Sequence, residues 1–99
     1  MKVICKNSSY DAITMLAFIN NNIRYPEVDE ECYVTRIHNY VMQGKVGFFL
    51  EGYEGQFIAD SKSRNTNELS FNQDRFVKAD RTQINKEDIK ELKKIKQLV

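Results

Sequence analysis

Apolar and polar residues alternate in several short segments of the chain, which is the pattern of half-buried β-strands. The two clearest segments are residues 31–38 and 45–51, which are separated by a glycine-containing loop. Shorter alternating or β-branched segments occur at 2–6, 69–71 and 76–78. This order predicts one mostly antiparallel sheet that curls into a very small β-barrel.

The residues between these segments indicate how the strands are connected. Residues 52–55 contain two glycines and predict a turn, after which residues 56–58 are expected to continue the sheet. Residues 60–67 are polar and predict an exposed loop. Residues 72–75 are expected to form a single helical turn that leads into the last strand.

Apolar residues recur at helical spacing in two other places. The first predicts a short helix at about residues 9–20, with Ser9 as its N-cap. Its recurring positions are Tyr10, Ile13, Leu16 or Ala17, and Ile19 or Asn20. The second predicts a C-terminal amphipathic helix, with Asn85 as its cap and Asp88 at the third helical position. Its stripe consists of Ile89, Leu92, Ile95 or Lys96, and Val99.

Length and charge limit the range of structures and partners. The 99 residues suit one domain, in which residues 1–81 form the barrel with its helical insertion and residues 82–99 form the C-terminal helix. A net charge of +1 gives no global field that would hold nucleic acid or an acidic membrane without a local patch. No apolar run approaches the roughly 18 residues of a membrane span.

The two cysteines and the first residues predict a compartment. The chain begins Met1-Lys2-Val3 without a basic and apolar leader, and its only cysteines are Cys5 and Cys32. We therefore expect a reduced protein of the cytoplasm, which is the host cytoplasm if a phage encodes it. Both thiols are expected to be buried as small hydrophobic groups.

No arrangement of reactive side chains predicts catalysis. Cys32 and His38 lie six residues apart on one strand, about 20 Å between Cα atoms, which excludes direct proton transfer. With one histidine and no Cys-x-x-Cys, neither a metal nor another cofactor is predicted. The acidic residues 29–31 are expected to be solvated. Only an enclosed pocket lined by Glu51, Glu54 or His38 would indicate an enzyme.

The aromatic residues are the main candidates for contact with a partner protein. On segment 45–51 the side chain of Phe49 points to the face opposite Val46, Phe48 and Leu50. Phe49 is therefore either exposed beside other aromatic residues or packed under the helix at 9–20. An exposed aromatic group commonly marks a partner surface. The predicted partner contacts are Arg36, Tyr40, Phe49 and Tyr53.

A small nucleic-acid-binding module is the alternative, because arginine and aromatic groups also stack on bases. Its predicted contacts are Arg36, Lys45, Lys62 and Arg64. The lysines of the C-terminal helix alternate with acidic residues, so a solvated helix face is expected there.

Four segments together resemble a family of small phage and prophage proteins of unassigned function. They are Lys2-Val3-Ile4-Cys5, Cys32-Tyr33-Val34-Thr35-Arg36-Ile37, Val46-Gly47-Phe48-Phe49-Leu50-Glu51 and Phe71-Asn72-Gln73-Asp74-Arg75-Phe76-Val77-Lys78-Ala79-Asp80. The resemblance implies an SH3-like barrel of about five strands. This chain departs from the family pattern before the second segment, where residues 28–31 stand in place of a Gly-Lys pair. The resemblance includes an arginine at the position of Arg75, for which a structural role is expected, with the guanidinium bonded to a carboxylate or to backbone carbonyls. Ligand binding by Arg75 is the less favoured alternative.

The sequence therefore predicts a mainly β protein with appended helices, of the α+β class. Its expected function is that of a phage or prophage accessory protein without enzymatic activity. Such a protein binds a host or phage protein and can inhibit a host enzyme or a defence component. A homodimer through the apolar stripe of the C-terminal helix is a further prediction, since that stripe must be buried somewhere.

Overall fold

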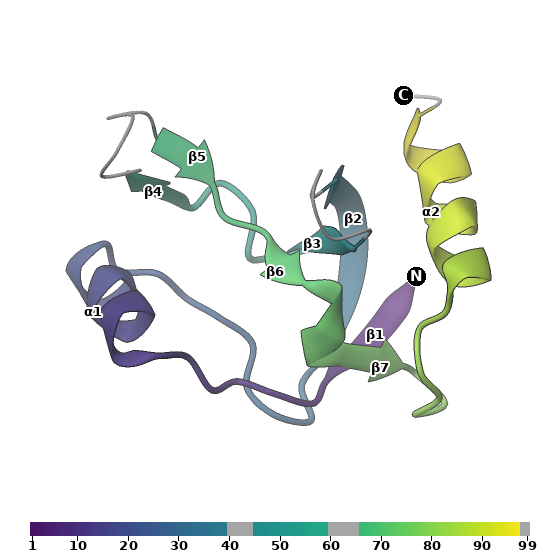
Figure 1. Cartoon of the computed structure of the whole chain (residues 1–99), viewed down its shortest axis with the longest axis horizontal. Helices are drawn as coiled ribbons and strands as arrows, with labels where there is room; N and C mark the ends of the chain where they lie inside the picture. The colour runs from purple at the N-terminus through teal and green to yellow at the C-terminus, as the bar shows by residue number, and fades with distance from the viewer. Residues whose placement is uncertain (40–44, 60–65, 98–99) are drawn as a thin grey trace.

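The protein has an α+β fold built on a five-stranded antiparallel sheet with two helices (Figure 1). The structure, a computed structural model, describes residues 1–39, 45–59 and 66–97. The elements in chain order are β1 Lys2–Cys5, α1 Ala12–Asn20, β2 Glu31–Asn39, β3 Val46–Leu50, β4 Phe57–Ala59, β5 Thr66–Glu68, β6 Phe71–Asn72, the 3-10 turn η1 Gln73–Arg75, β7 Phe76–Lys78, and α2 Lys86–Gln97. The strands predicted around residues 2–6, 31–38, 45–51 and 76–78 are thus confirmed.

Strand β2 lies at the centre of the sheet, whose order is β6-β3-β2-β1-β7. Its first part pairs with β1, where Tyr33 lies opposite Lys2, and the remainder pairs with β3. The register shifts between Val34 and Arg36, which marks a bulge where a strand bends and twists more strongly. Among the described residues no pairing joins the edge strands β6 and β7, so the closed barrel expected from the sequence is not observed.

The segment predicted to continue the main sheet instead forms a separate ribbon. Strand β4 pairs with β5, with Phe57 opposite Glu68. The preceding turn redirects the chain, since Gly52 and Gly55 adopt φ values of 86° and 76° that favour glycine. The Leu69 N–H donates to the Gln56 carbonyl at 2.7 Å, which joins the two ends of this ribbon.

The core lies between the bent sheet and α2. Its largest fully buried side chains include Phe48, Phe76 and Leu50. Cys5 and Cys32 are 2% and 3% exposed, which confirms their prediction as buried hydrophobic groups. Burial raises the pKa of the Cys32 thiol to about 12, so this thiol stays protonated and unreactive at neutral pH.

Helix α2 lies beside β2 (Figure 1), and two residues of its predicted apolar stripe, Ile89 and Leu92, pack against the chain's own core. The side chains of Ile95, Lys96 and Val99 lie outside the described part of the structure. The Asp88 N–H donates to the Asn85 side chain at 3.0 Å, and the Asn85 N–H donates to the Asp88 carboxylate at 2.9 Å. This reciprocal pair is the predicted capping box. Leu92 is only 3% exposed and Ile89 packs against the same cluster. Burial of these two residues therefore does not require a second copy of the chain.

Helix α1 lies at the other end of the molecule from α2 (Figure 1). It begins later than predicted, because its N-cap is Asp11 and not Ser9. The Asp11 carboxylate accepts a hydrogen bond from the Thr14 N–H at 2.7 Å, whereas the Ser9 N–H donates to the side chain of Asn7. The carboxylate is the stronger acceptor for the free N–H groups of the first helical turn.

Candidate docking surface

The outward face of α1 is apolar and exposed. Ile13, Leu16 and Ile19 are 84%, 59% and 67% exposed, and no residue of α1 carries a charge. These residues lie three apart, so they share one side of the helix. We call these three residues the α1 stripe. The sequence predicted that they share a face, but in the structure that face points away from the sheet.

An aromatic cluster fixes the orientation of α1 from the opposite face of the helix. Phe18 is 3% exposed, and its ring centroid lies 4.8 Å from that of Tyr10 and 5.5 Å from that of Tyr25. The rings of Tyr10 and Tyr25 meet edge to face at 5.2 Å. Burial raises the pKa of Tyr10 to about 12, so its hydroxyl stays neutral. Because Phe18 is the inward anchor, the α1 stripe must point outward.

Arg75 connects this cluster to the main sheet. Its guanidinium carbon lies 3.8 Å from the centre of the Tyr10 ring. Its Nη1 donates to the backbone carbonyls of Ser9 at 2.7 Å and Asn7 at 3.3 Å. The contact with backbone carbonyls predicted for Arg75 is therefore confirmed. None of the ion pairs formed among the described residues includes Arg75.

A groove of about 420 Å³ lies beside the aromatic cluster, between α1, β4 and the segment that runs from β6 into η1. Its apolar walls include Ile13, Ala17, Phe18, Ile58, Leu69 and Phe71. Arg75 lines the same groove. Ile13 belongs to both the groove and the α1 stripe, so the two form one continuous apolar surface. This groove could not be predicted from the sequence, because its walls come from segments far apart in the chain.

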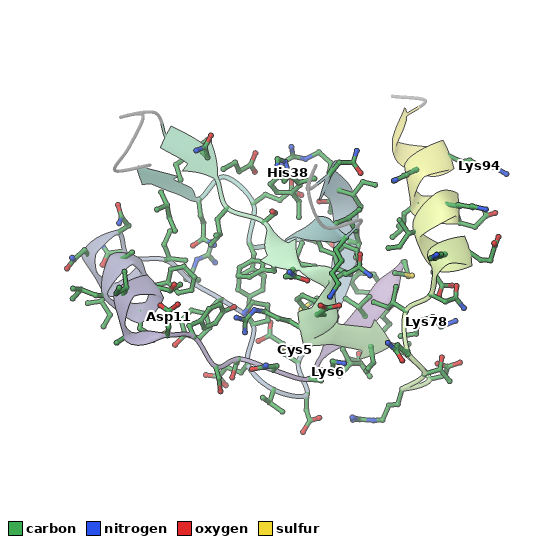
Figure 2. All side chains as sticks on the ribbon, in the orientation of Figure 1. Cys5, Lys6, Asp11, His38, Lys78 and Lys94 are labelled. Atoms are coloured by element: carbon green, nitrogen blue, oxygen red, sulfur yellow. The ribbon has the colours of Figure 1, made fainter. Side chains whose placement is uncertain are left out.

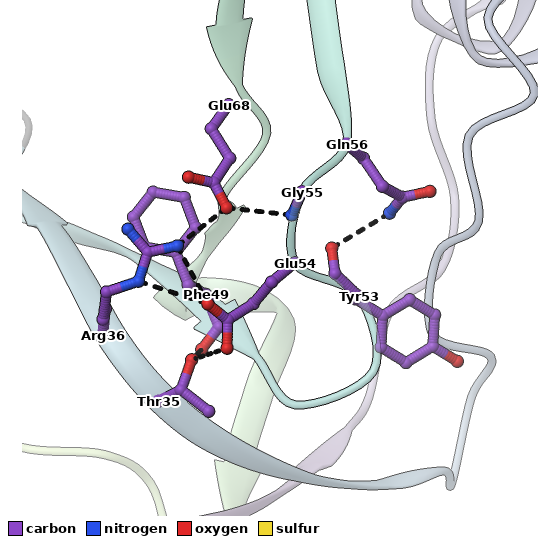
Figure 3. Close-up of polar contacts among 8 residues, drawn as sticks. All are labelled: Thr35, Arg36, Phe49, Tyr53, Glu54, Gly55, Gln56 and Glu68. Carbon is purple, nitrogen blue, oxygen red and sulfur yellow. Dashed lines mark hydrogen bonds and ion pairs between the residues drawn. The ribbon is translucent and has the colours of Figure 1, made fainter.

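Phe49, the first predicted partner contact, is 7% exposed and lies beneath a neighbouring arginine (Figure 3). The Arg36 guanidinium carbon lies 4.2 Å from the centre of the Phe49 ring. The rings of His38 and Phe49 meet edge to face, at 6.4 Å between centroids. Exposure of Phe49 is therefore wrong. Arg36 covers the Phe49 ring. The other alternative, that Phe49 packs under α1, is also wrong.

Arg36 is held by two carboxylates on the same surface (Figure 3). Its Nη2 lies 2.9 Å from a Glu54 oxygen and 2.7 Å from a Glu68 oxygen. The same Glu68 oxygen accepts the Gly55 N–H at 3.0 Å. The hydrogen bonds that Arg36 donates to Glu54 and then to Glu68 raise the pKa of its guanidinium. The arrangement fastens the β4–β5 ribbon to β2, which is a structural role for Arg36.

Tyr53, another predicted contact, is half-buried and donates its hydroxyl proton to Glu30. Burial and then this hydrogen bond raise the pKa of Tyr53. The neighbouring acidic residues are also paired. Asp29 lies 3.2 Å from Arg81, and Glu31 lies 2.9 Å from Lys2.

The remaining predicted contacts are only partly described. Tyr40, Lys62 and Arg64 lie outside the residues that the structure describes. Lys45 forms an ion pair with Asp74. Whether the predicted residues contact a protein or a nucleic acid stays a prediction.

A second hollow of about 380 Å³ lies between α2 and η1. Its lining includes Lys86, Lys90 and Lys93, whereas Lys94 points away from the body of the molecule (Figure 2). The sequence predicted only a solvated helix face for these lysines. Neither hollow is lined by Glu51, Glu54 or His38, the residues considered for an enzyme.

Within residues 1–39, 45–59 and 66–97, no three His, Cys, Asp or Glu side chains gather closely enough to hold a metal ion. The helices in this part of the chain are all too short or too polar to cross a membrane. No protein-family model matches the chain, and no curated protein or solved structure matches it significantly.

Proposed function

We propose that this chain is a phage or prophage accessory protein without enzymatic activity, which binds another protein through the α1 stripe. One observation carries the proposal: three large aliphatic side chains are exposed side by side on a helix that has no charged residue. Burying apolar surface contributes about 25 cal/mol per Å². A partner that covers Ile13, Leu16 and Ile19 therefore gains free energy that this chain leaves unused.

The spacing of the α1 stripe suits a known mode of recognition. Amphipathic helices commonly insert residues three or four positions apart into an apolar groove of a partner. The aromatic anchor and the Asp11 cap hold α1 in place before binding, which lowers the entropic cost of association. Such a surface can inhibit a host enzyme or a defence component by covering it, with no chemistry of its own.

We further propose that the scaffold carrying α1 is an SH3-like barrel in a half-open form. Its support is the strand order β6-β3-β2-β1-β7, in which the two edge strands are consecutive in the chain and are linked by the short turn η1. The register shift in β2 also supports it, because a bulge bends a strand, as the sheet of a small barrel requires. The long connections of the sheet then carry α1 and the β4–β5 ribbon.

The test is affinity capture from a host lysate with the tagged chain, with and without nuclease. We expect a stoichiometric protein partner that survives nuclease and is lost in Leu16→Glu. Val28→Glu is the matched control, because Val28 is 52% exposed on a turn away from α1 and receives the same charge. Equal capture by both variants, or no partner at all, would contradict the proposal.

Nucleic-acid binding is the second candidate, and the three lysines along the second hollow are the observation that favours it. It predicts retention on single-stranded DNA or RNA that weakens steeply with salt and is lost in the triple variant Lys86→Gln, Lys90→Gln and Lys93→Gln. Capture that disappears after nuclease treatment would favour this candidate over the first.

A further inference from the structure

We infer that the groove beside α1 receives a partner segment that inserts an apolar side chain and places an Asp or Glu carboxylate against Arg75. This inference rests on the proposed function and names the chemistry of the segment that is bound. The groove volume of about 420 Å³ lies within the range of small binding pockets, roughly 300 to 1,000 Å³. It is large enough for one bulky aliphatic or aromatic side chain.

The charge of Arg75 selects the acidic residue of the partner. Two other arginines are neutralised within the chain, Arg36 by Glu54 and Glu68 and Arg81 by Asp29, whereas Arg24 lies over the ring of Tyr53 and not beside the groove. Arg75 instead bonds two backbone carbonyls, which carry no net charge.

The guanidinium also keeps hydrogen-bonding capacity for a ligand. It has five N–H donors. Both hydrogen bonds that Arg75 forms among the described residues come from Nη1, so the Nε and Nη2 donors have no acceptor there. These bonds and the stack on Tyr10 fix the group at the wall of an apolar groove. A carboxylate that reaches it forms a charge-assisted bond in a partly dehydrated place, which is stronger than one formed in open water.

The test is selection of a displayed library of random 12-residue peptides on the intact chain. We expect enriched peptides that place Leu, Ile, Phe or Trp within a few residues of Asp or Glu. Replacing that acidic residue by its amide should weaken binding about tenfold, the effect of one charge-assisted hydrogen bond. In Arg75→Gln the acidic peptide and its amide should bind equally.

The groove itself is tested without changing Arg75, so the result does not depend on how well Arg75→Gln folds. Ala17→Leu places three extra carbons into the groove, and it should weaken the selected peptide at least about tenfold. Ala12→Leu is the matched control, because Ala12 is exposed on the same helix and does not line the groove. The Ala12→Leu variant should bind the selected peptide with the affinity of the original chain. Circular dichroism should show the same helix content in both variants.

Three results would overturn the inference: no enriched peptide, enriched peptides without an acidic residue, or equal binding to Ala17→Leu and Ala12→Leu. Its failure can be told apart from failure of the proposed function. A captured partner that is lost in Leu16→Glu but kept in Ala17→Leu leaves the α1 stripe as the docking surface and removes the groove from it.

Discussion

The two helices of this protein have similar apolar stripes and use them in opposite ways. In α2 the described stripe residues Ile89 and Leu92 face inward, and Leu92 is 3% exposed. In α1 the stripe faces outward, and Leu16 is 59% exposed. The charges follow the same division, since α2 carries lysines and glutamates on its solvent side whereas α1 carries none.

This difference shows that helical periodicity identifies the residues that share a face but not the direction in which that face points. The direction of α1 is set by a single residue of the other face, Phe18, which packs with Tyr10 and Tyr25. The contacts of Phe18 with two aromatic rings outside the helix thus decide which face of α1 points inward, although three aliphatic residues lie on the other face. An inward stripe stabilises the fold, whereas an outward stripe is available to a partner.

The largest expected effect separates the two stripes by stability. Leu92→Ala removes a buried side chain from the core and should lower the free energy of unfolding by about 3 kcal/mol. Leu16→Ala changes an exposed position and should stay within about 0.5 kcal/mol of the original chain. Urea denaturation followed by circular dichroism measures both. Equal losses would mean that the two stripes are buried alike.

A smaller effect compares the two helix caps. Asn85→Ala removes the cap of α2, which packs on the core, and should lower the free energy of global unfolding by about 1 kcal/mol. Asp11→Ala removes the cap of α1, which attaches mainly through Phe18. It should leave global unfolding unchanged and speed amide hydrogen exchange in α1 about fivefold. A global loss in Asp11→Ala would show that α1 unfolds together with the sheet.

The smallest effect depends on pH. The hydrogen bond from the Thr14 N–H lowers the pKa of the Asp11 carboxyl. A lowered pKa means that the carboxylate stabilises α1 above its unfolded pKa of about 3.9, and that this contribution is lost as pH falls through the lower folded value. NMR Cα shifts of α1 should therefore lose helical character in acid. Asp11→Asn should show no such transition, and the same transition in both chains would contradict the assignment.

The strands and the C-terminal helix could be predicted because their local patterns agree with their final surroundings. Alternation in 31–38 and 45–51 matches β2 and β3, and the pair Asn85 and Asp88 forms a capping box within four residues of chain. The contact of Arg75 with backbone carbonyls was one of the two bonding modes expected for a guanidinium in a structural role.

The features that could not be predicted depend on contacts between distant segments. Phe49 is covered by Arg36, whose position depends on Glu68 on another strand. Residues 56–58 leave the main sheet because β5 returns to pair with them. The groove beside α1 exists only where three such segments meet. No local sequence pattern predicts these contacts between distant segments.

The orientation of the two stripes is tested most directly by thiol labelling of Leu16→Cys and Leu92→Cys. The native thiols of Cys5 and Cys32 are buried, so they contribute little background. With a maleimide at neutral pH, we predict that Leu16→Cys reacts as fast in the folded chain as in denaturant. Leu92→Cys should react at least about 100-fold more slowly when folded. Comparable protection at both positions would contradict an outward-facing α1.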